Sequence, residues 1–364
     1  MGSSTLDAPK LASLPIISVE PLLLPNGHGR LSTTAAIHAA CSEYGFFYLD
    51  ISSYVNPSEP EELAELARDF FARPQEEKDQ ISITKEDNAR GYQKLNENVT
   101  NGKADNHEGI DWYRPVENPD KSKPLWGENQ WPDIPGFKEK YERWVEKMKN
   151  LGLIVMEAMA TGLGMTPEEW AELRTKVDDS FWVMRAIGYP PLPGDHDGIS
   201  CGAHRDYGCL TFLYADPTPG ALQVFLAQPG FLVEKKGGFK SVPEQEVEEG
   251  GQWINADPIP GCVVCNIGEM WEVWTNGLYQ STLHRVVHRG SSYRVSIPFF
   301  FEPNFDALIA PLPAALRLQE EDRAVRGVRG GTPRKTYQPV VYGDFLLRKV
   351  GSNFDTGKGR YDEN

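Results

Sequence analysis

Apolar residues in the first half of the chain recur with the spacing of α-helices. Within residues 32–44, residues 60–71 and a segment that begins at Phe137, apolar side chains return every three or four positions. Such a stripe is typical of a helix with one face turned to a core. The sequence therefore predicts three helices here. Their apolar stripes are Ile37, Cys41, Tyr44, Leu63, Leu66, Phe70, Tyr141, Trp144, Met148, Leu151 and Val155.

The segments around these helices carry other local signals. Residues 14–17 form a short apolar run, and Pro15 places the expected strand at a sheet edge. Residues 86–135 are rich in Asn, Gly, Pro and Trp, and we expect irregular structure there. Thr166 and Glu169 have the spacing of a capping box, which predicts the start of a further helix.

After residue 179 the pattern changes to short runs of β-branched and aromatic residues separated by turn residues. Several short strands without helices between them indicate an antiparallel sandwich, jelly roll or barrel. Residues 226–251 interrupt the pattern with glycines and an acidic run, and either a lid or a solvated insertion would fit. The runs are residues 181–187, 210–214, 222–225, 262–266, 283–287 and 293–301.

These patterns predict an α+β protein with three regions that form one integrated unit. A helical and mixed region (1–178) packs on a β core (179–305), and an extension with short helices (306–364) follows. Its length of 364 residues is enough to bury a sizeable core.

Charge narrows the possible partners. The net charge is −15 and the pI is about 5.0, which argues against nucleic acid or an anionic membrane as the main partner. The basic run at 326–335 is short and is expected to be a solvated loop. No signal peptide or long apolar span is visible, so we expect a cytoplasmic monomer.

The cysteines are five in number, which is sparse and odd for a disulfide framework, and we expect reduced thiols. Cys262 and Cys265 have C-x-x-C spacing but lie in a predicted strand. Their sulfur atoms should therefore point to opposite faces, which disfavours a redox or zinc site.

One constellation of polar residues stands out among the predicted strands. His204 and Asp206 are two residues apart, and on a strand both would project to the same face. His284 lies in a later predicted strand that could return beside the first. Two imidazoles and one carboxylate form the facial triad that holds non-haem iron(II) and leaves other positions open.

A second pair strengthens this interpretation. Arg294 and Ser296 share one face of the last predicted strand. A guanidinium inside a largely apolar strand needs a partner for its charge, and a carboxylate is its natural match. The rival ligand His288 would share a face with His284, but the surrounding sequence favours His284.

These motifs, taken in order, resemble the iron(II)/2-oxoglutarate-dependent oxygenases, in the subgroup that includes isopenicillin N synthase and plant flavonoid oxygenases. The resemblance covers nearly the whole chain and implies a double-stranded β-helix, or jelly roll, flanked by N-terminal helices. It rests on residues 14–17, 45–48, 70–74, 90–92, 204–208, 220–224, 281–286, 294–300 and 342–346.

The resemblance also implies roles for single residues. His204, Asp206 and His284 would bind Fe(II), and Arg294 and Ser296 would bind the distal carboxylate of 2-oxoglutarate. The further expectations are that Tyr189 assists this binding and that the substrate is contacted by Phe300, Arg90 and Tyr92.

The function implied is an oxygenase of secondary metabolism that uses O2 and couples 2-oxoglutarate decarboxylation to hydroxylation, desaturation or cyclisation of a small molecule. Two other enzyme outcomes stay open: an oxidase of the same fold that needs no 2-oxoglutarate, and an ethylene-forming enzyme. The second is suggested by the 226–251 insertion together with residues 301–305. A non-catalytic sensor is disfavoured because it would not need open iron positions.

Overall fold

The computed structural model describes residues 13–24, 26–100, 103–227, 250–325 and 336–352. The central part of the insertion at 226–251 and the basic run at 326–335 lie outside the described residues. In the described ranges, no helix is both long and apolar enough to cross a membrane. A cytoplasmic, monomeric state remains a prediction.

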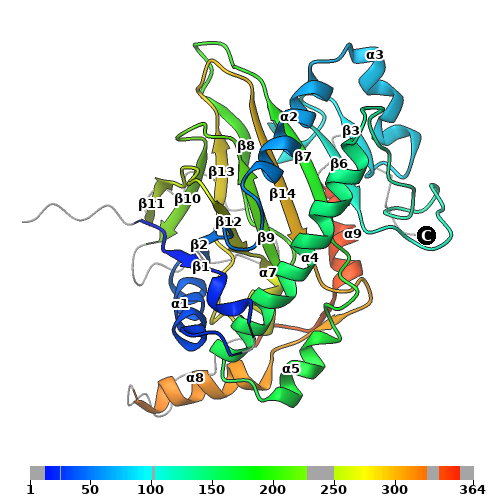
Figure 1. The fold of residues 1–364 in the computed structure, drawn as a ribbon. Helices are drawn as coiled ribbons and strands as arrows, with labels where there is room; N and C mark the ends of the chain where they lie inside the picture. Colours follow the sequence, from blue (N-terminus) through cyan, green and yellow to red (C-terminus); the bar gives the residue numbers. More distant parts are fainter. Residues whose placement is uncertain (1–12, 25, 101–102, 228–249, 326–335, 353–364) are drawn as a thin grey trace, which may run out of the picture.

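Two β-sheets form the centre of the molecule, and the larger one has eight strands (Figure 1). Its strand order mixes early and late segments of the chain. The early strands β1 and β2 lie at one end, the early strands β6 and β3 lie at the other, and the later strands lie between them. Across the sheet the strands are β1 (Ile16–Ser18), β2 (Phe46–Asp50), β12 (Cys262–Ile267), β9 (Leu210–Ala215), β14 (Arg294–Phe301), β7 (Val183–Tyr189), β6 (Glu108–Tyr113) and β3 (Gly91–Gln93).

The smaller sheet has four strands and faces the larger one, which gives the expected double-stranded β-helix. Its pairings are antiparallel, as short strands without intervening helices predict. Its order is β11 (Gly251–Asn255), β10 (Leu222–Ala227), β13 (His284–Val287) and β8 (Ile199–His204). Two short strand pairs lie outside both sheets: β4 (Val99–Thr100) with β5 (Lys103–Ala104), and β15 (Leu308–Ile309) with β16 (Val340–Val341).

The helices flank this core, and the three early helices predicted from their stripes are confirmed within two residues of their expected starts. The capping box of Thr166 and Glu169 is also confirmed. The helices are α1 (Arg30–Glu43), α2 (Ser58–Phe71), α3 (Gln75–Lys78), α4 (Phe137–Gly162), α5 (Pro167–Arg174), α7 (Glu269–Trp274), α8 (Pro313–Val325) and α9 (Tyr342–Ser352). Short 3-10 helices span Glu20–Leu22, Asp79–Ile81 and Ile83–Lys85.

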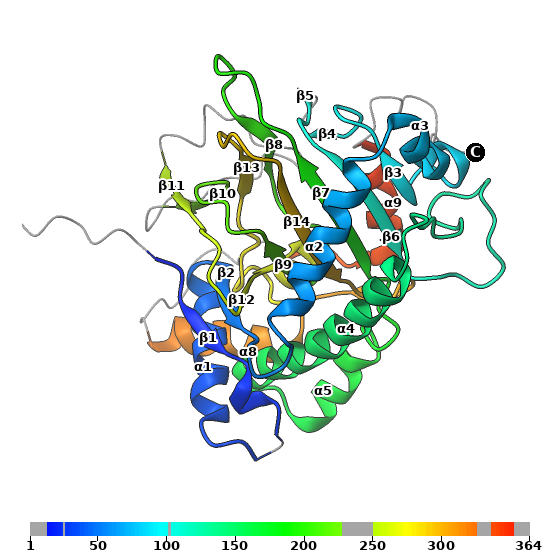
Figure 2. The same cartoon turned by 45° about the horizontal axis from the view of Figure 1, so that its top comes forward.

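Strand β14 shows how this packing positions a site. Helices α2 and α4 pack against its outer face, as Figures 1 and 2 show. At Gly152 of α4, an added Cβ would lie 2.3 Å from the ring of Phe301, so the helix approaches the strand closely. Because successive side chains alternate, Arg294, Ser296 and Phe300 point to the opposite face, toward the smaller sheet.

Other strand expectations are also borne out. β1 lies at the edge of the larger sheet, as Pro15 predicts, although it pairs with β2 in parallel. All five cysteines are free. Cys262 packs against the cluster between the sheets and Cys265 lies in the helix-covered core, so the two sulfurs do point to opposite faces.

The expectation of irregular structure over residues 86–135 is wrong in part. Strands β3 and β6 lie within this stretch and extend the larger sheet beyond β7. All six residues of β6 are buried, including Glu108 and Asp111, so the strand lacks the alternation of apolar and polar residues that marks a half-buried strand. Strands from residues 1–178 thus pair with core strands, while the three-region boundaries remain a prediction.

Candidate functional site

The two candidate histidine ligands lie side by side on the smaller sheet. Strands β8 and β13 pair antiparallel, with His204 directly opposite His284. Directly opposed residues project to the same face, and the ring centroids are 4.3 Å apart. The prediction that a later strand returns beside the first is confirmed.

Asp206 joins them in a different way from the one expected. Strand β8 ends at His204, so Asp206 lies in the loop that follows and the i, i+2 argument does not apply to it. Its carboxylate is placed by contacts with the larger sheet instead. The Thr211 hydroxyl of β9 and the Asn266 amide of β12 both donate hydrogen bonds to Oδ2, the latter at 2.6 Å.

The three ligand atoms converge on one point. Oδ1 of Asp206 is 3.7 Å from Nε2 of His204 and 3.5 Å from Nε2 of His284. All three possible ligand atoms lie within 4.8 Å of one another. Metal ligands around one ion have such separations, so the cluster fits a small metal ion.

The opposite nitrogen of each imidazole is held by the backbone. Nδ1 of His204 lies 2.9 Å from the carbonyl of Gly202, and Nδ1 of His284 lies 3.1 Å from the carbonyl of Thr282. A proton on Nδ1 would satisfy each bond and leave a lone pair on Nε2. Such support is the usual way in which a metal-binding histidine is oriented.

The carboxylate is kept ionised by its surroundings. Burial alone would raise the pKa of Asp206, but the His284 and His204 imidazoles and the Thr211 hydroxyl lower that pKa below its ordinary range. Two imidazoles and one carboxylate are a donor set that suits non-haem iron(II).

Beside this cluster lies the candidate carboxylate clamp, formed by Arg294, Ser296 and Tyr189. Arg294 of β14 lies directly opposite Tyr189 of β7, with its guanidinium 4.7 Å from the centre of the tyrosine ring. Ser296 donates a long hydrogen bond of 3.5 Å to the Tyr189 hydroxyl. The structure therefore brings together the three residues predicted to bind one carboxylate.

The Arg294 side chain has no carboxylate partner among the residues that the structure describes. The residue is only 1% exposed, and within the described chain its Nε and Nη1 atoms have no hydrogen-bond partner. A buried guanidinium without acceptors is costly. A carboxylate from a ligand would supply both charge and acceptors, so the residues fit a bound 2-oxo acid.

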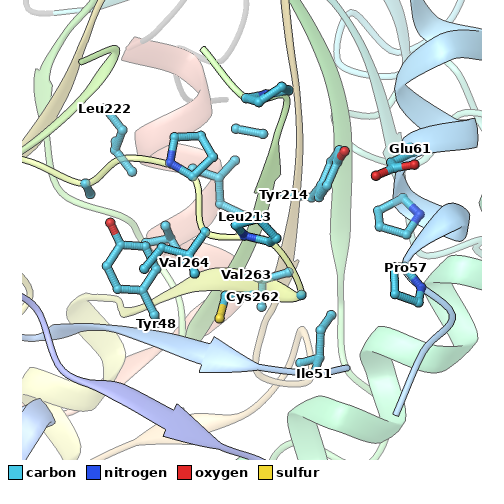
Figure 3. Close-up of a pocket in the computed structure, with 18 of the residues that line it drawn as sticks. Tyr48, Ile51, Pro57, Glu61, Leu213, Tyr214, Leu222, Cys262, Val263 and Val264 are labelled. Carbon is cyan, nitrogen blue, oxygen red and sulfur yellow. The ribbon is translucent and has the colours of Figure 1, made fainter. Parts of the chain in front are cut away.

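A cavity of about 210 Å³ adjoins this clamp (Figure 3). Its walls come mainly from β9, from residues 256–264 that lead into β12, and from residues 48–61 between β2 and the start of α2, with Tyr48 and Leu222 facing Tyr214 and Glu61 across it. Arg294 is among its lining residues, whereas none of the three candidate metal ligands is. The cavity therefore belongs to the arginine end of the site.

The three residues predicted to contact substrate lie in different settings. Phe300 is partly exposed on the inner face of β14 and pairs with Thr211, which bonds Asp206. Arg90 is fully buried in an ion pair with Asp87. Tyr92 is buried and its hydroxyl donates to the Glu108 carboxylate at 2.6 Å. The structure places only Phe300 near the ligand cluster, and all three substrate roles remain predictions.

The rival histidine lies outside the ligand cluster. His288 follows the end of β13 and is fully buried. Its Nε2 lies 2.8 Å from the carbonyl of Ser292. This contact gives it a structural partner, and His284 remains the candidate ligand.

Several polar residues of the interior were missed by the sequence reasoning. Asp111, Arg185 and Gln93 form a connected group on β6, β7 and β3. His107 lies against Tyr189, with ring centroids 5.6 Å apart, and Glu302 is buried beside the Asp206 loop. One signal was readable, because Arg185 interrupts an apolar run and has the same parity as Tyr189.

Comparisons with known proteins agree with this geometry. Residues 14–134 match a family model described as the non-haem dioxygenase in morphine synthesis N-terminal region, and residues 179–303 match the 2OG-Fe(II) oxygenase superfamily. The chain is 38% identical to a homoarginine-6-hydroxylase of Glycine max, over 95% of this chain and 99% of that protein. A homoarginine-6-hydroxylase of Arabidopsis thaliana is 36% identical, over 94% of this chain and 98% of the relative.

A solved structure shows the same fold. The crystal structure of a full-length Neurospora crassa protein in complex with alpha-KG and thymine superposes with a TM-score of 0.72 at 25% identity. The match covers 93% of this chain and 96% of that one. The fold is thus shared over almost the whole length.

Proposed function

The chain belongs to the 2OG-Fe(II) oxygenase superfamily, and from that premise we propose that it hydroxylates the side chain of a free cationic amino acid, with homoarginine as the first candidate. It is an Fe(II)- and 2-oxoglutarate-dependent dioxygenase that acts on a small molecule. The identity of the substrate, a free cationic amino acid, is our proposal.

The observation that carries the proposal is the near full-length match to relatives named homoarginine-6-hydroxylase. A match at 38% identity over 99% of the relative extends through the loops and the extra strands β3 and β6, and is not confined to the metal motif. Substrate contacts in such a fold come from these less regular parts of the chain.

The residue roles belong to the same proposal. His204, Asp206 and His284 hold the iron, and Arg294, Ser296 and Tyr189 would bind the distal carboxylate of 2-oxoglutarate. When bound, iron(II) supplies the chemistry in which O2 and 2-oxoglutarate yield succinate and CO2, with one oxygen atom inserted into a substrate C–H bond.

The contribution of the chain itself is orientation and charge balance. The backbone carbonyls of Gly202 and Thr282 fix the imidazoles, and Thr211 with Asn266 fix the carboxylate. Arg294 lacks a hydrogen-bond partner for Nε and Nη1 among the described residues. This favours an enzyme that binds 2-oxoglutarate over an oxidase that needs no 2-oxoglutarate. Ethylene formation in the absence of substrate is checked by headspace gas analysis.

The experiment is a turnover assay of Fe(II)-loaded protein with 2-oxoglutarate, O2 and a panel of homoarginine, arginine, lysine, ornithine and thymine. We expect succinate formation to be stimulated by the guanidino amino acids, with an equal amount of a product that is heavier by one oxygen atom. His204→Ala should abolish turnover and iron binding. His196→Ala, which changes a histidine of an exposed loop, should leave both intact.

The substrate assignment would be overturned by a panel in which only thymine stimulates succinate formation, or in which no amino acid is hydroxylated. Loss of iron binding in His196→Ala with full activity in His204→Ala would overturn the ligand assignment.

A further inference from the structure

A group of polar side chains lies on the inner face of the larger sheet, beside the carboxylate clamp. We call Gln93, His107, Asp111 and Arg185 the β6–β7 cluster. The strand register places them, because Gln93, Gly109, Ile187 and Ser296 form one row across β3, β6, β7 and β14. Asp111 and Arg185 form the next row on the same face.

Asp111 is the centre of the cluster. Arg185 donates from Nε to Oδ1 at 2.6 Å, and Gln93 donates from Nε2 to Oδ2 at 2.7 Å. Both carboxylate oxygens are thus engaged, and the residue is only 4% exposed. The aspartate holds the arginine and the amide in place.

The two terminal nitrogens of Arg185 make no hydrogen bond to a described residue. In the described part of the chain, the bond from Nε to Asp111 is the one hydrogen bond of its guanidinium. The guanidinium reaches over Gly109, where an added Cβ would lie 3.9 Å from Nη2, and the side chain is 20% exposed. Two terminal nitrogens in a planar fork suit a carboxylate.

Two acceptors of the same cluster also lack a partner in the described ranges. Oε1 of Gln93 and Nε2 of His107 are buried without a hydrogen bond to any described residue. Nδ1 of His107 lies 3.0 Å from the carbonyl of Ser200, and burial lowers the pKa of this histidine to about 4. The ring is therefore neutral at pH 7, and Nε2 is an acceptor.

The unpaired terminal nitrogens of Arg185 can donate to a carboxylate, and Gln93 Oε1 and His107 Nε2 can accept from an ammonium group. The head group of an amino acid carries both. We propose that the β6–β7 cluster binds this head group, with the α-carboxylate on Arg185 and the α-ammonium donating to Gln93 Oε1 and His107 Nε2. This inference rests on the proposed function and deepens it by naming the residues that would select a free amino acid.

The position of the cluster agrees with the site of oxidation in the relatives. The next row of side chains contains Val183, Phe300 and Thr211, and Thr211 donates to Asp206. Arg185 of β7 therefore lies one row along and two strands across from Thr211, the residue of β9 that bonds Asp206. A substrate oxidised at carbon 6, as the relatives' name states, holds its reacting carbon far from its head group.

The first test needs no variant. The kcat/KM of the wild-type enzyme is measured for homoarginine and for homoarginine amide, in which an uncharged carboxamide replaces the α-carboxylate. We expect the amide to be about 10- to 100-fold poorer, as for the loss of hydrogen bonds between charged groups. A wild-type enzyme that uses the amide as well as the acid would overturn the inference.

The second test locates the effect. Arg185→Met combined with Asp111→Asn removes the pair without leaving a buried aspartate charge. We expect the preference for acid over amide to fall to about threefold or less, mainly through KM for the acid. Arg185→Lys should recover part of the preference. The matched control is Arg114→Met with Asp179→Asn, a pair at the exposed end of β6, which should keep the full preference.

The readouts separate the two proposals. Binding of 2-oxoglutarate, followed by its visible charge-transfer band with Fe(II), reports an intact site in every variant. If no cationic amino acid is turned over although this band is present, the proposed function fails. If homoarginine is turned over and the double variant keeps the full acid preference, the β6–β7 cluster is not the head-group site.

Discussion

Among the described residues, two arginines are almost completely buried, and their surroundings differ. Arg90 is 0% exposed and donates from Nη1 to Asp87 at 2.5 Å and from Nη2 to the carbonyl of Arg114 at 3.0 Å. Arg294 is 1% exposed, and within the described residues it stacks on Tyr189 without an acceptor for Nε or Nη1. The charge of Arg90 is thus neutralised by a residue of the fold, whereas the charge of Arg294 would be neutralised by a bound ligand.

Glu302 shows a third way to bury an ionisable group. It is 4% exposed, accepts a hydrogen bond from the backbone of Cys209, and has no salt bridge to a described residue. Burial, with the charge of Asp206 adding to it, raises the pKa of Glu302 to about 8. A carboxyl can discharge itself by binding a proton, whereas an arginine cannot. Arg294 therefore depends on an anion from outside.

The largest effect on stability is expected from removing Arg90, whose charge is paired with Asp87 inside the protein. Arg90→Met should lower the free energy of unfolding by about 3 kcal/mol, because it leaves the Asp87 charge buried. The value is at the low end of that range because backbone N–H groups of Ala89, Arg90 and Gly127 still bond Asp87. Denaturant unfolding measures it, and KM for 2-oxoglutarate should not change.

Its control is Arg73→Met, which removes an exposed ion pair with Glu77. That variant should lose less than about 1 kcal/mol. Equal losses in the two variants, or a large rise in KM for Arg90→Met, would mean that Arg90 is not a purely structural residue.

A smaller effect, and one that depends on pH, is expected for Glu302. Between its ordinary pKa of 4.5 and its raised value of about 8, the native state binds a proton that the unfolded chain has released. The free energy of unfolding therefore falls as pH rises through this window, by at most about 1.4 kcal/mol per pH unit from this group.

Glu302→Gln should remove that slope. The measurement is denaturant unfolding of both proteins at pH 5.5, 6.5 and 7.5 under the same salt conditions. A difference between the two proteins that stays constant over this range would show that the pKa of Glu302 is not raised.

The smallest effect is expected from the neutral part of the clamp. Ser296→Ala should raise KM for 2-oxoglutarate by about fivefold, which corresponds to about 1 kcal/mol for one hydrogen bond. Steady-state succinate formation measures it, with Ser122→Ala of an exposed loop as the control. An unchanged KM would remove Ser296 from the clamp.

Much of the fold was predictable because local pattern and tertiary role agree. The stripe of α4 describes one buried face, which the structure confirms, and parity along the predicted strand placed Arg294 and Ser296 on one face of β14, as observed. Strands β3 and β6 were not predictable, because β6 is buried on both faces and carries Glu108 and Asp111 in place of apolar residues. Its partners come from β3 and β7, which no local window contains.

The site shows the same division. The return of the later strand that carries His284 beside His204 could be expected, but Asp206, which strand parity placed beside His204, reaches them from a loop, held by Thr211 and Asn266. That geometry depends on the larger sheet and not on spacing. The partners of Arg90 and Arg185 differ in kind: Arg90 pairs with Asp87, three residues away, whereas Arg185 pairs with Asp111 of β6, which is distant in the sequence and could not be predicted from it.

The most direct test of the contrast between the two arginines is an anaerobic titration of the Fe(II)-loaded protein with 2-oxoglutarate, followed by the visible charge-transfer band. Wild type, Arg90→Met and Arg294→Met are compared. We predict that Arg294→Met binds 2-oxoglutarate about 10- to 100-fold more weakly, while Arg90→Met binds it as the wild type does. An Arg294→Met protein with wild-type affinity would contradict the account.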